Sequence, residues 1–194
     1  MRRAEVERIT GETSVKVVLE LDGSGKGEIS TGIGFLDHML NLFARHGFLD
    51  LTVQACGDLE VDCHHTVEDI GICIGQAFKQ ALGDKAGIRR YGSVAIPMDE
   101  TLMLAAIDFS GRAWLNMDVQ FTVSRLGTMD TEMFQEFFYA FAVNAGMNLH
   151  LKQLFGSNNH HIAESMFKAL GQAVDQAVTL DPRIQGVRST KGVL

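Results

Sequence analysis

Two copies of one short motif contain residue types that bind metal ions. The pattern His-His-x-x-Glu begins at His64 and again at His160, so that Glu68 and Glu164 follow the first histidine of each pair by four positions. On a helix, residues four apart lie on one face with their Cβ atoms about 5–6 Å apart, so a His and Glu at this spacing can bind the same cation. The pattern therefore predicts two half-sites for metal, one in each copy.

The second histidine of each motif, His65 or His161, points in a different direction. A helix turns by about 100° per residue, so adjacent side chains cannot serve the same ion. We expect each of them to complete the site begun by the other motif, either within one chain or between chains. Aligning FLDHMLNLF with MFQEFFYAF adds one further ligand to each site. The predicted ligand sets are His38, His65, His160 and Glu164 for one ion, and His64, Glu68, Glu136 and His161 for the other.

Four nitrogen and oxygen ligands leave open positions on an octahedral ion such as manganese or iron, and catalysis requires an open position. A structural zinc site would instead be closed. A single motif of this kind is also explained by histidines that cap a helix or pack in the core beside a solvated glutamate. The recurrence of the motif in register favours the metal interpretation.

The motifs belong to a longer internal repeat. The stretch HHTVEDIGICIGQAFKQAL from His64 aligns without a gap with HHIAESMFKALGQAVDQAV from His160, and eight of the nineteen positions are identical. Upstream, Glu12-Thr13 and then LDGSG from Leu21 are echoed in the same order by Glu100-Thr101 and then IDFSG from Ile107, which pairs Asp22 with Asp108. Such self-similarity predicts two fused repeats, at about 1–86 and 87–180, that form a single catalytic unit with a tail at 181–194.

Each repeat has the same predicted order of elements. In the first, a strand is marked by alternating apolar residues, Val15, Val17 and Leu19, and the turn after it by Asp22 to Gly25. One face of a helix that ends at Gly47 is marked by Leu36, Met39, Leu40 and Phe43. A strand near 48–53 then leads to the motif helix. The second repeat is predicted to have strands near 92–97, 102–108, 112–119 and 147–153, and helices near 130–145 and 160–178. The pattern predicts an α+β fold made of a duplicated β-β-β-α-β-α unit, with helices packed on one face of each sheet.

The composition and net charge of the chain indicate which kind of partner it binds. The chain has 194 residues, 46% of them hydrophobic, and a net charge of -7. An acidic surface argues against general binding to nucleic acid or to an anionic membrane, so a small molecule is the expected partner. There is no run of 18 apolar residues, and the initial MRRAEVERIT has two arginines but no apolar stretch, which predicts a cytoplasmic protein without a membrane span or signal peptide. The three cysteines, Cys56, Cys63 and Cys73, are odd in number and have no C-x-x-C spacing, so we expect reduced thiols rather than disulfides.

Five ordered motifs make the chain resemble the imidazoleglycerol-phosphate dehydratase family, the lyases of histidine biosynthesis. They are RITGET from Arg8, GFLDHML from Gly34, CHHTVED from Cys63, NNHHIAE from Asn158 and STKGVL from Ser189. The resemblance implies a hydro-lyase that converts D-erythro-imidazoleglycerol phosphate to imidazole acetol phosphate and water. It also implies two manganese ions (Mn²⁺) per active site, a fold similar to the second domain of ribosomal protein S5, and a large homo-oligomer, a shell of twenty-four subunits built from trimers that share metal ligands.

The same resemblance assigns residue roles. It implies substrate contacts at Glu12, Arg90, Arg112, Ser189 and Lys191, and metal ligands at His38, His64, His65, Glu68, His160, His161 and Glu164. The chain departs from the family pattern at Glu136, where a histidine is usual; a carboxylate is an acceptable donor, so Glu136 is kept as a ligand. Glu12 is the first candidate for the catalytic base and Glu164 the second, and Glu68 is also a candidate catalytic residue.

Two other functions use the same residues. A two-metal phosphatase would activate water against the phosphate and release it. A metal store with a structural shell would load many ions per chain and leave imidazoleglycerol phosphate unchanged. An assay on that substrate, together with elemental analysis, separates the three.

Overall fold

The computed structural model describes residues 2–194, and within them both predicted β-β-β-α-β-α repeats are present. The first repeat contains β1 (Arg3–Ile9), β2 (Thr13–Glu20), β3 (Gly27–Ser30), α1 (Gly34–His46), β4 (Asp50–Gly57) and α2 (His64–Leu82). The second contains β5 (Tyr91–Met98), β6 (Thr101–Asp108), β7 (Trp114–Asp118), α3 (Met133–Ala145), β10 (Asn148–Phe155) and α4 (Asn159–Val178). A short hairpin, β8 (Arg125–Leu126) and β9 (Met129–Asp130), precedes α3 and was not predicted.

The two four-stranded sheets have the same topology. Their strand orders are β1-β2-β4-β3 and β5-β6-β10-β7. In each sheet the first three strands pair antiparallel with one another, whereas the fourth is parallel to the third: β3 runs parallel to β4, and β7 runs parallel to β10. Parallel neighbours need a crossover connection, and α1 and α3 provide it. The shared topology confirms the predicted duplicated α+β fold.

Periodicity in the sequence explains the individual elements. On β2, Val15, Val17 and Leu19 alternate with more exposed residues and are fully buried, as expected of a strand with one face toward the core. On α1 the four predicted apolar positions are all buried, and the helix ends before Gly47 as expected. No helix among residues 2–194 is both long and apolar enough to cross a membrane.

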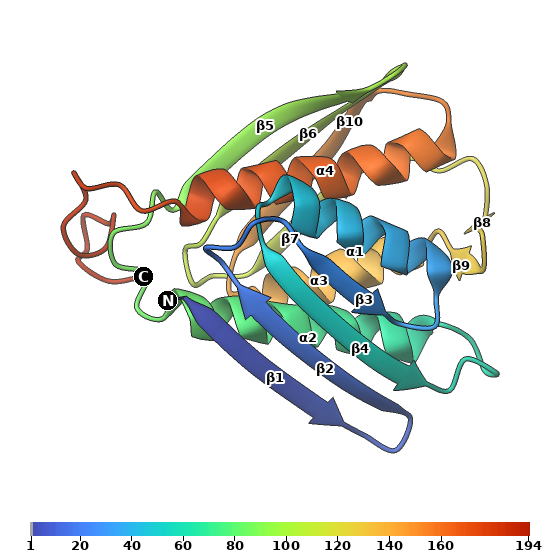
Figure 1. The fold of residues 1–194 in the computed structure, drawn as a ribbon. Helices are drawn as coiled ribbons and strands as arrows, with labels where there is room; N and C mark the ends of the chain where they lie inside the picture. Colours follow the sequence, from blue (N-terminus) through green and yellow to red (C-terminus); the bar gives the residue numbers. More distant parts are fainter. Residues whose placement is uncertain (1) are drawn as a thin grey trace.

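The four helices lie between the two sheets (Figure 1). Helix α2 packs mainly on α3, and α1 packs on α4, so each helix pair joins the two repeats. Buried side chains of both repeats form one hydrophobic cluster. The first residues of α1, α2 and α4 lie at the right-hand end of the molecule in Figure 1, whereas the C-terminal tail lies at the left-hand end. The two His-His-x-x-Glu motifs therefore lie at one end of the molecule and the C-terminal tail at the other.

The glycine that recurs in the repeat explains how closely the helices approach. A Cβ at Gly75 of α2 would lie 2.8 Å from the Phe141 carbonyl oxygen of α3, and a Cβ at Gly171 of α4 would lie 2.8 Å from the Phe43 carbonyl oxygen of α1. Any side chain at either position would push the helix pair apart. The repeated glycine thus preserves the contact that brings α1 beside α4.

Candidate metal-binding active site

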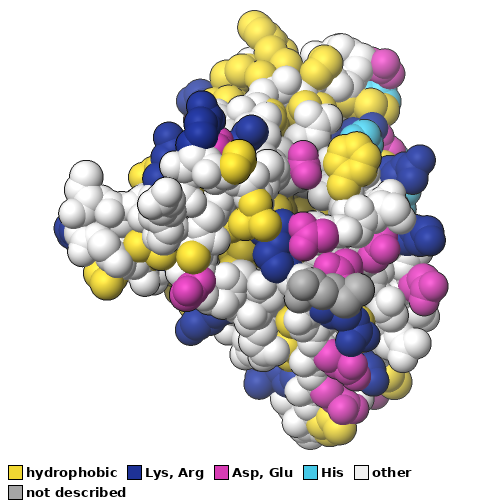
Figure 2. Space-filling view, turned by 60° about the vertical axis from the view of Figure 1, so that its left-hand side comes forward, with side chains coloured by type: hydrophobic (Ala, Val, Ile, Leu, Met, Phe, Trp, Pro, Cys, Tyr) yellow, Lys and Arg dark blue, Asp and Glu magenta, His cyan; other side chains and the backbone are white. Residues whose placement is uncertain are grey.

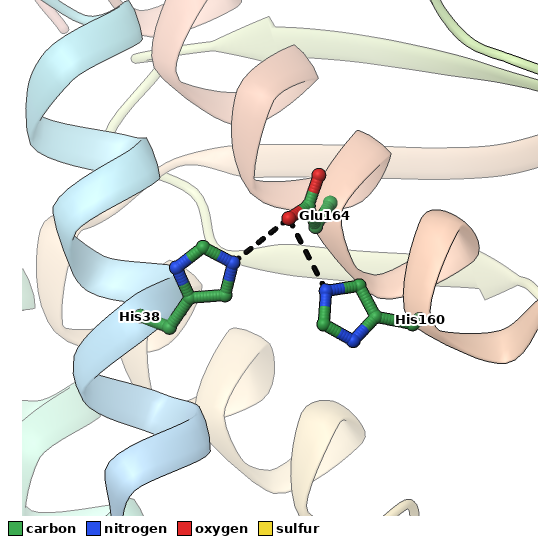
Figure 3. A group of neighbouring side chains, drawn as sticks. All are labelled: His38, His160 and Glu164. Carbon is green, nitrogen blue, oxygen red and sulfur yellow. Dashed lines mark hydrogen bonds and ion pairs between the residues drawn. The ribbon is translucent and has the colours of Figure 1, made fainter.

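His38, His160 and Glu164 gather where α1 meets α4 (Figure 3). His38 Nε2 lies 2.8 Å from Glu164 Oε1, and His160 Nε2 lies 3.2 Å from the same oxygen. Their ligand atoms all lie within 4.8 Å of one another. His160 and Glu164 are one turn apart on α4, as the motif predicted, whereas His38 comes from the other repeat.

The start of α4 is fixed by Asn158. Its side-chain oxygen accepts hydrogen bonds from the backbone N–H groups of His160 and His161, at 2.9 and 3.3 Å. This satisfies two donors that the first turn of a helix leaves without a partner in the helix. The cap therefore sets where both motif histidines leave the helix.

Glu164 is an ionised carboxylate with a shielded position. Burial raises its pKa, but hydrogen bonds from Lys168 and His38 outweigh burial and lower the pKa to about 2. The Lys168 ammonium lies 2.8 Å from Oε2, which leaves Oε1 to the two imidazoles. Two imidazole nitrogens around one carboxylate oxygen form a donor set that suits a divalent ion such as manganese, iron or zinc.

His65 belongs to a second group of potential ligands, with Glu12 and Asp58. His65 Nδ1 lies 2.9 Å from Asp58 Oδ2 and 3.7 Å from Glu12 Oε2. The hydrogen bond to Asp58, with further contributions from the nearby acids, raises the pKa of His65. Within one chain, His65 therefore faces Asp58 and Glu12, and the three-residue cluster of Figure 3 forms without it.

His161 is held in a similar way by a different acid. Its Nδ1 lies 2.7 Å from Glu100 Oε2, and its Nε2 lies 3.7 Å from Asp99 Oδ2. The hydrogen bond to His161, followed by those from the backbone of Asn158 and Ser157, lowers the pKa of Glu100.

The remaining predicted ligands are less tightly gathered. His64 Nε2 lies 4.0 Å from Glu68 Oε2, one turn along α2. Glu136 on α3 is partly buried, and the ligand atoms of these three residues do not all lie within 4.8 Å of one another. The structure thus brings together one predicted ligand set in part and leaves the other open.

Four of the five predicted substrate contacts line one cavity of about 480 Å³ beside the C-terminal tail. These are Arg90, Arg112, Ser189 and Lys191. Several Lys and Arg side chains gather on this end of the molecule (Figure 2). Arg112 and Lys191 form no ion pair with any residue among 2–194, so both cations are available to a phosphate. The fifth residue, Glu12, is not part of this cavity.

Arg90 has a partly structural role in that cavity. Its guanidinium contacts both oxygens of Asp108, at 2.6 and 3.0 Å, and donates to the Arg188 carbonyl oxygen at 2.9 Å. The hydrogen bond to Asp108 raises the pKa of Arg90. Arg90 therefore ties the tail to β6 and shapes the wall of the cavity.

Sequence reasoning missed several residues that orient the predicted ones. Lys168, Asp58 and Asp108 contact Glu164, His65 and Arg90, respectively. Glu100, which contacts His161, had a signal in the sequence, because it is the counterpart of Glu12 in the repeat. Asp108 also had one, as the counterpart of Asp22, whereas Lys168 and Asp58 have no pattern around them.

Known proteins match the chain along its length. The family model described as imidazoleglycerol-phosphate dehydratase matches residues 31–174. A protein of that name from Lachnoclostridium phytofermentans is 62% identical over 193 residues, covering 100% of this chain and 98% of the relative. Another from Streptococcus mutans is 59% identical over 194 residues and is covered completely, as is this chain.

Solved structures agree with the sequence relatives. The crystal structure of imidazoleglycerol-phosphate dehydratase from Staphylococcus aureus has a TM-score of 0.84 and 38% identity, covering 92% of this chain and 99% of that one. The enzyme from Pyrococcus furiosus in complex with (S)-C348 also has a TM-score of 0.84 and 38% identity, covering 97% and 100%. With a family model across most of its length and relatives near 60% identity, the chain belongs to the imidazoleglycerol-phosphate dehydratase family of hydro-lyases.

Proposed function

We propose that the chain dehydrates D-erythro-imidazoleglycerol phosphate to imidazole acetol phosphate and water in histidine biosynthesis, and that it does so with two Mn²⁺ ions per active site. Family membership supports the reaction. The observation that carries the metal dependence is the convergence of His38 Nε2 and His160 Nε2 on the ionised Glu164. The metal ligands would be His38, His64, His65, Glu68, Glu136, His160, His161 and Glu164.

We infer that the two repeats and the tail act as one catalytic unit, and that complete sites form between subunits. Helix α4 has 20 residues and is therefore about 30 Å long. The His38 cluster includes His160 in the first turn of α4. The cavity of Arg112 and Lys191 is lined by residues of the C-terminal tail, and this tail lies beside the other end of α4 (Figure 1). Imidazoleglycerol phosphate, a single ring with a three-carbon chain and a phosphate, is much shorter than this helix and cannot reach both in one chain. A neighbouring subunit in a large homo-oligomer, a 24-subunit shell of trimers, would bring them together.

The chain's own residues position the substrate. Arg112, Lys191 and Ser189 would bind the phosphate by charge-assisted hydrogen bonds. Holding one end of the substrate fixes the distance of its reacting carbons from the base, which lowers the entropic cost of the reaction. Bound Mn²⁺ would supply Lewis-acid stabilisation of negative charge on the substrate.

Glu12 is the better candidate for the base. Its side chain is 58% exposed, and its one ion pair with any of residues 2–194 is with His65, at 3.7 Å. Glu164 has a pKa of about 2, and a carboxylate with so low a pKa is a weak base at neutral pH. Glu164 is therefore assigned to metal, and Glu12 to the proton on carbon. Glu68 is also assigned to metal, because it has the place in its motif that Glu164 has in the other. Loss of that proton and of the neighbouring hydroxyl gives an enol, which becomes the ketone.

The test combines elemental analysis of the purified protein with an assay on imidazoleglycerol phosphate. We expect bound Mn²⁺, formation of imidazole acetol phosphate with its phosphate retained, and loss of turnover in chelator that is restored by Mn²⁺. Release of inorganic phosphate would support the phosphatase instead, and unchanged substrate with many ions per chain would support a metal store. Sedimentation of the native protein measures the assembly in the same samples. Fractionation of producing cells tests the proposed cytoplasmic location.

A further inference from the structure

The second histidine of each motif is held at Nδ1 by a carboxylate. Asp58 Oδ2 lies 2.9 Å from His65 Nδ1, and Glu100 Oε2 lies 2.7 Å from His161 Nδ1. In both rings Nε2 is left as the nitrogen that can bind an ion. His38 and His160 also present Nε2, toward Glu164. The same nitrogen is therefore offered by four of the candidate ligands.

The two acids do not correspond in the repeat. Asp58 directly follows β4, and the residue that directly follows the corresponding strand β10 is Gly156, so the second repeat has no acid at that position. Glu100 is instead the counterpart of Glu12, in the turn between β5 and β6. Glu12 stays 3.7 Å from His65 Nδ1 while Asp58 forms the hydrogen bond. Glu100 therefore forms the hydrogen bond to the second motif histidine in its repeat, whereas its counterpart Glu12 does not.

Glu100 is itself fixed by the start of α4. Its Oε1 lies 2.7 Å from the backbone N–H donor of Asn158, 3.1 Å from that of Ser157 and 3.0 Å from the Thr101 hydroxyl. These contacts join the β5–β6 turn to the helix that carries His161. The carboxylate can therefore hold the ring with little freedom of its own.

We propose that Asp58 and Glu100 are positioning residues that keep His65 and His161 protonated at Nδ1, so that Nε2 has a free lone pair for the metal ion. The assignment rests on the proposed metal dependence. Histidines that bind metals commonly donate their other N–H to a carboxylate, which fixes both the tautomer and the ring orientation. Because Asp58 accepts the hydrogen bond from His65 Nδ1, Glu12 is left free for the substrate. In the second repeat, Glu100 accepts the hydrogen bond from His161 Nδ1.

Two isosteric variants test the assignment. In Glu100→Gln, the amide oxygen can still accept from Ser157 and Asn158, but the amide NH2 then faces His161 Nδ1. Nδ1 must become the acceptor, which places the proton on Nε2 and opposes metal binding. Asp58→Asn reverses the hydrogen bond to His65 in the same way. Each variant is expected to weaken binding of Mn²⁺ by about 10- to 100-fold.

The measurement is a Mn²⁺ titration of the metal-free full-length protein, with free Mn²⁺ counted by electron paramagnetic resonance, alongside the thermal midpoint of the metal-free protein. Glu60→Gln is the matched control, because Glu60 is an exposed acid two residues from Asp58 that has no ion pair with any of residues 2–194. It should bind Mn²⁺ like the wild type.

Weaker binding with a nearly unchanged midpoint supports the positioning role. Wild-type affinity in both variants overturns it, and so does a lowered midpoint with wild-type affinity, because that outcome assigns the acids to stability alone. A wild-type protein that binds no Mn²⁺ overturns the proposed metal dependence itself, and the positioning role with it.

Discussion

Lys168 lies 2.8 Å from Glu164 Oε2, the oxygen that faces away from His38 and His160. The two residues are one turn apart on α4, with side chains only 15% and 10% exposed. Lys168 therefore neutralises a shielded carboxylate and fixes which of its oxygens is directed to the imidazoles.

Lys168→Ala should destabilise the metal-free protein by about 1 to 3 kcal/mol, because the shielded Glu164 loses its charged partner. The free energy of unfolding in urea measures the change. Lys152→Ala is the control: Lys152 pairs with Asp118 at 2.7 Å, but both side chains are more than half exposed, so the loss should be below about 1 kcal/mol. Equal losses in the two variants would contradict the role given to Lys168.

Glu12→Gln should lower kcat by about 10²- to 10⁴-fold and preserve Mn²⁺ binding and assembly, because an amide cannot accept the proton from carbon. Steady-state kinetics on imidazoleglycerol phosphate provides the measurement. Glu7→Gln removes an exposed carboxylate from the adjacent strand and should behave as the wild type. Unaltered turnover in Glu12→Gln would remove Glu12 from the mechanism.

His64→Ala and His161→Ala should each remove both turnover and the large assembly, because we expect the motif to bind metal between subunits. Sedimentation velocity in Mn²⁺ and in chelator reports the assembly. His150→Ala, an exposed histidine on β10, should change neither property. A wild-type protein that keeps its full assembly and turnover in chelator would refute the prediction.

Alkaline pH should destabilise the fold partly through Cys73. Burial raises the pKa of this thiol to about 11, from an ordinary value of 9.0. Between these values the unfolded chain releases a proton that the folded chain retains, so the free energy of unfolding falls as pH rises. Cys73→Ala should reduce the loss of stability between pH 8 and pH 10.5, by on the order of 1 kcal/mol. Urea unfolding at both pH values measures this.

The exposed Cys56 provides the comparison for that experiment. Cys56→Ala keeps the buried thiol and should lose stability with pH just as the wild type does. An identical pH dependence in Cys73→Ala would show that the Cys73 thiol does not contribute.

The internal repeat and its main elements could be assigned from the order of residues in the chain. Strand and helix periods are local properties, so Val15 to Leu19 and the apolar face of α1 could be assigned from residue spacing alone. The spacing of His160 and Glu164 likewise predicted a shared helix face, which the structure contains. The short hairpin β8–β9 was missed because two-residue strands have too few positions to show a period.

The pairs of side chains that meet in the site depend instead on how elements distant in the sequence pack together. His38 and Glu164 are 126 positions apart, and their contact depends on the packing of α1 on α4 through Gly171. The partners of His65 and His161, Asp58 and Glu100, follow from how a loop and a turn lie beside the helix starts. Such contacts depend on the summed packing of both repeats, and no local pattern of residues encodes them.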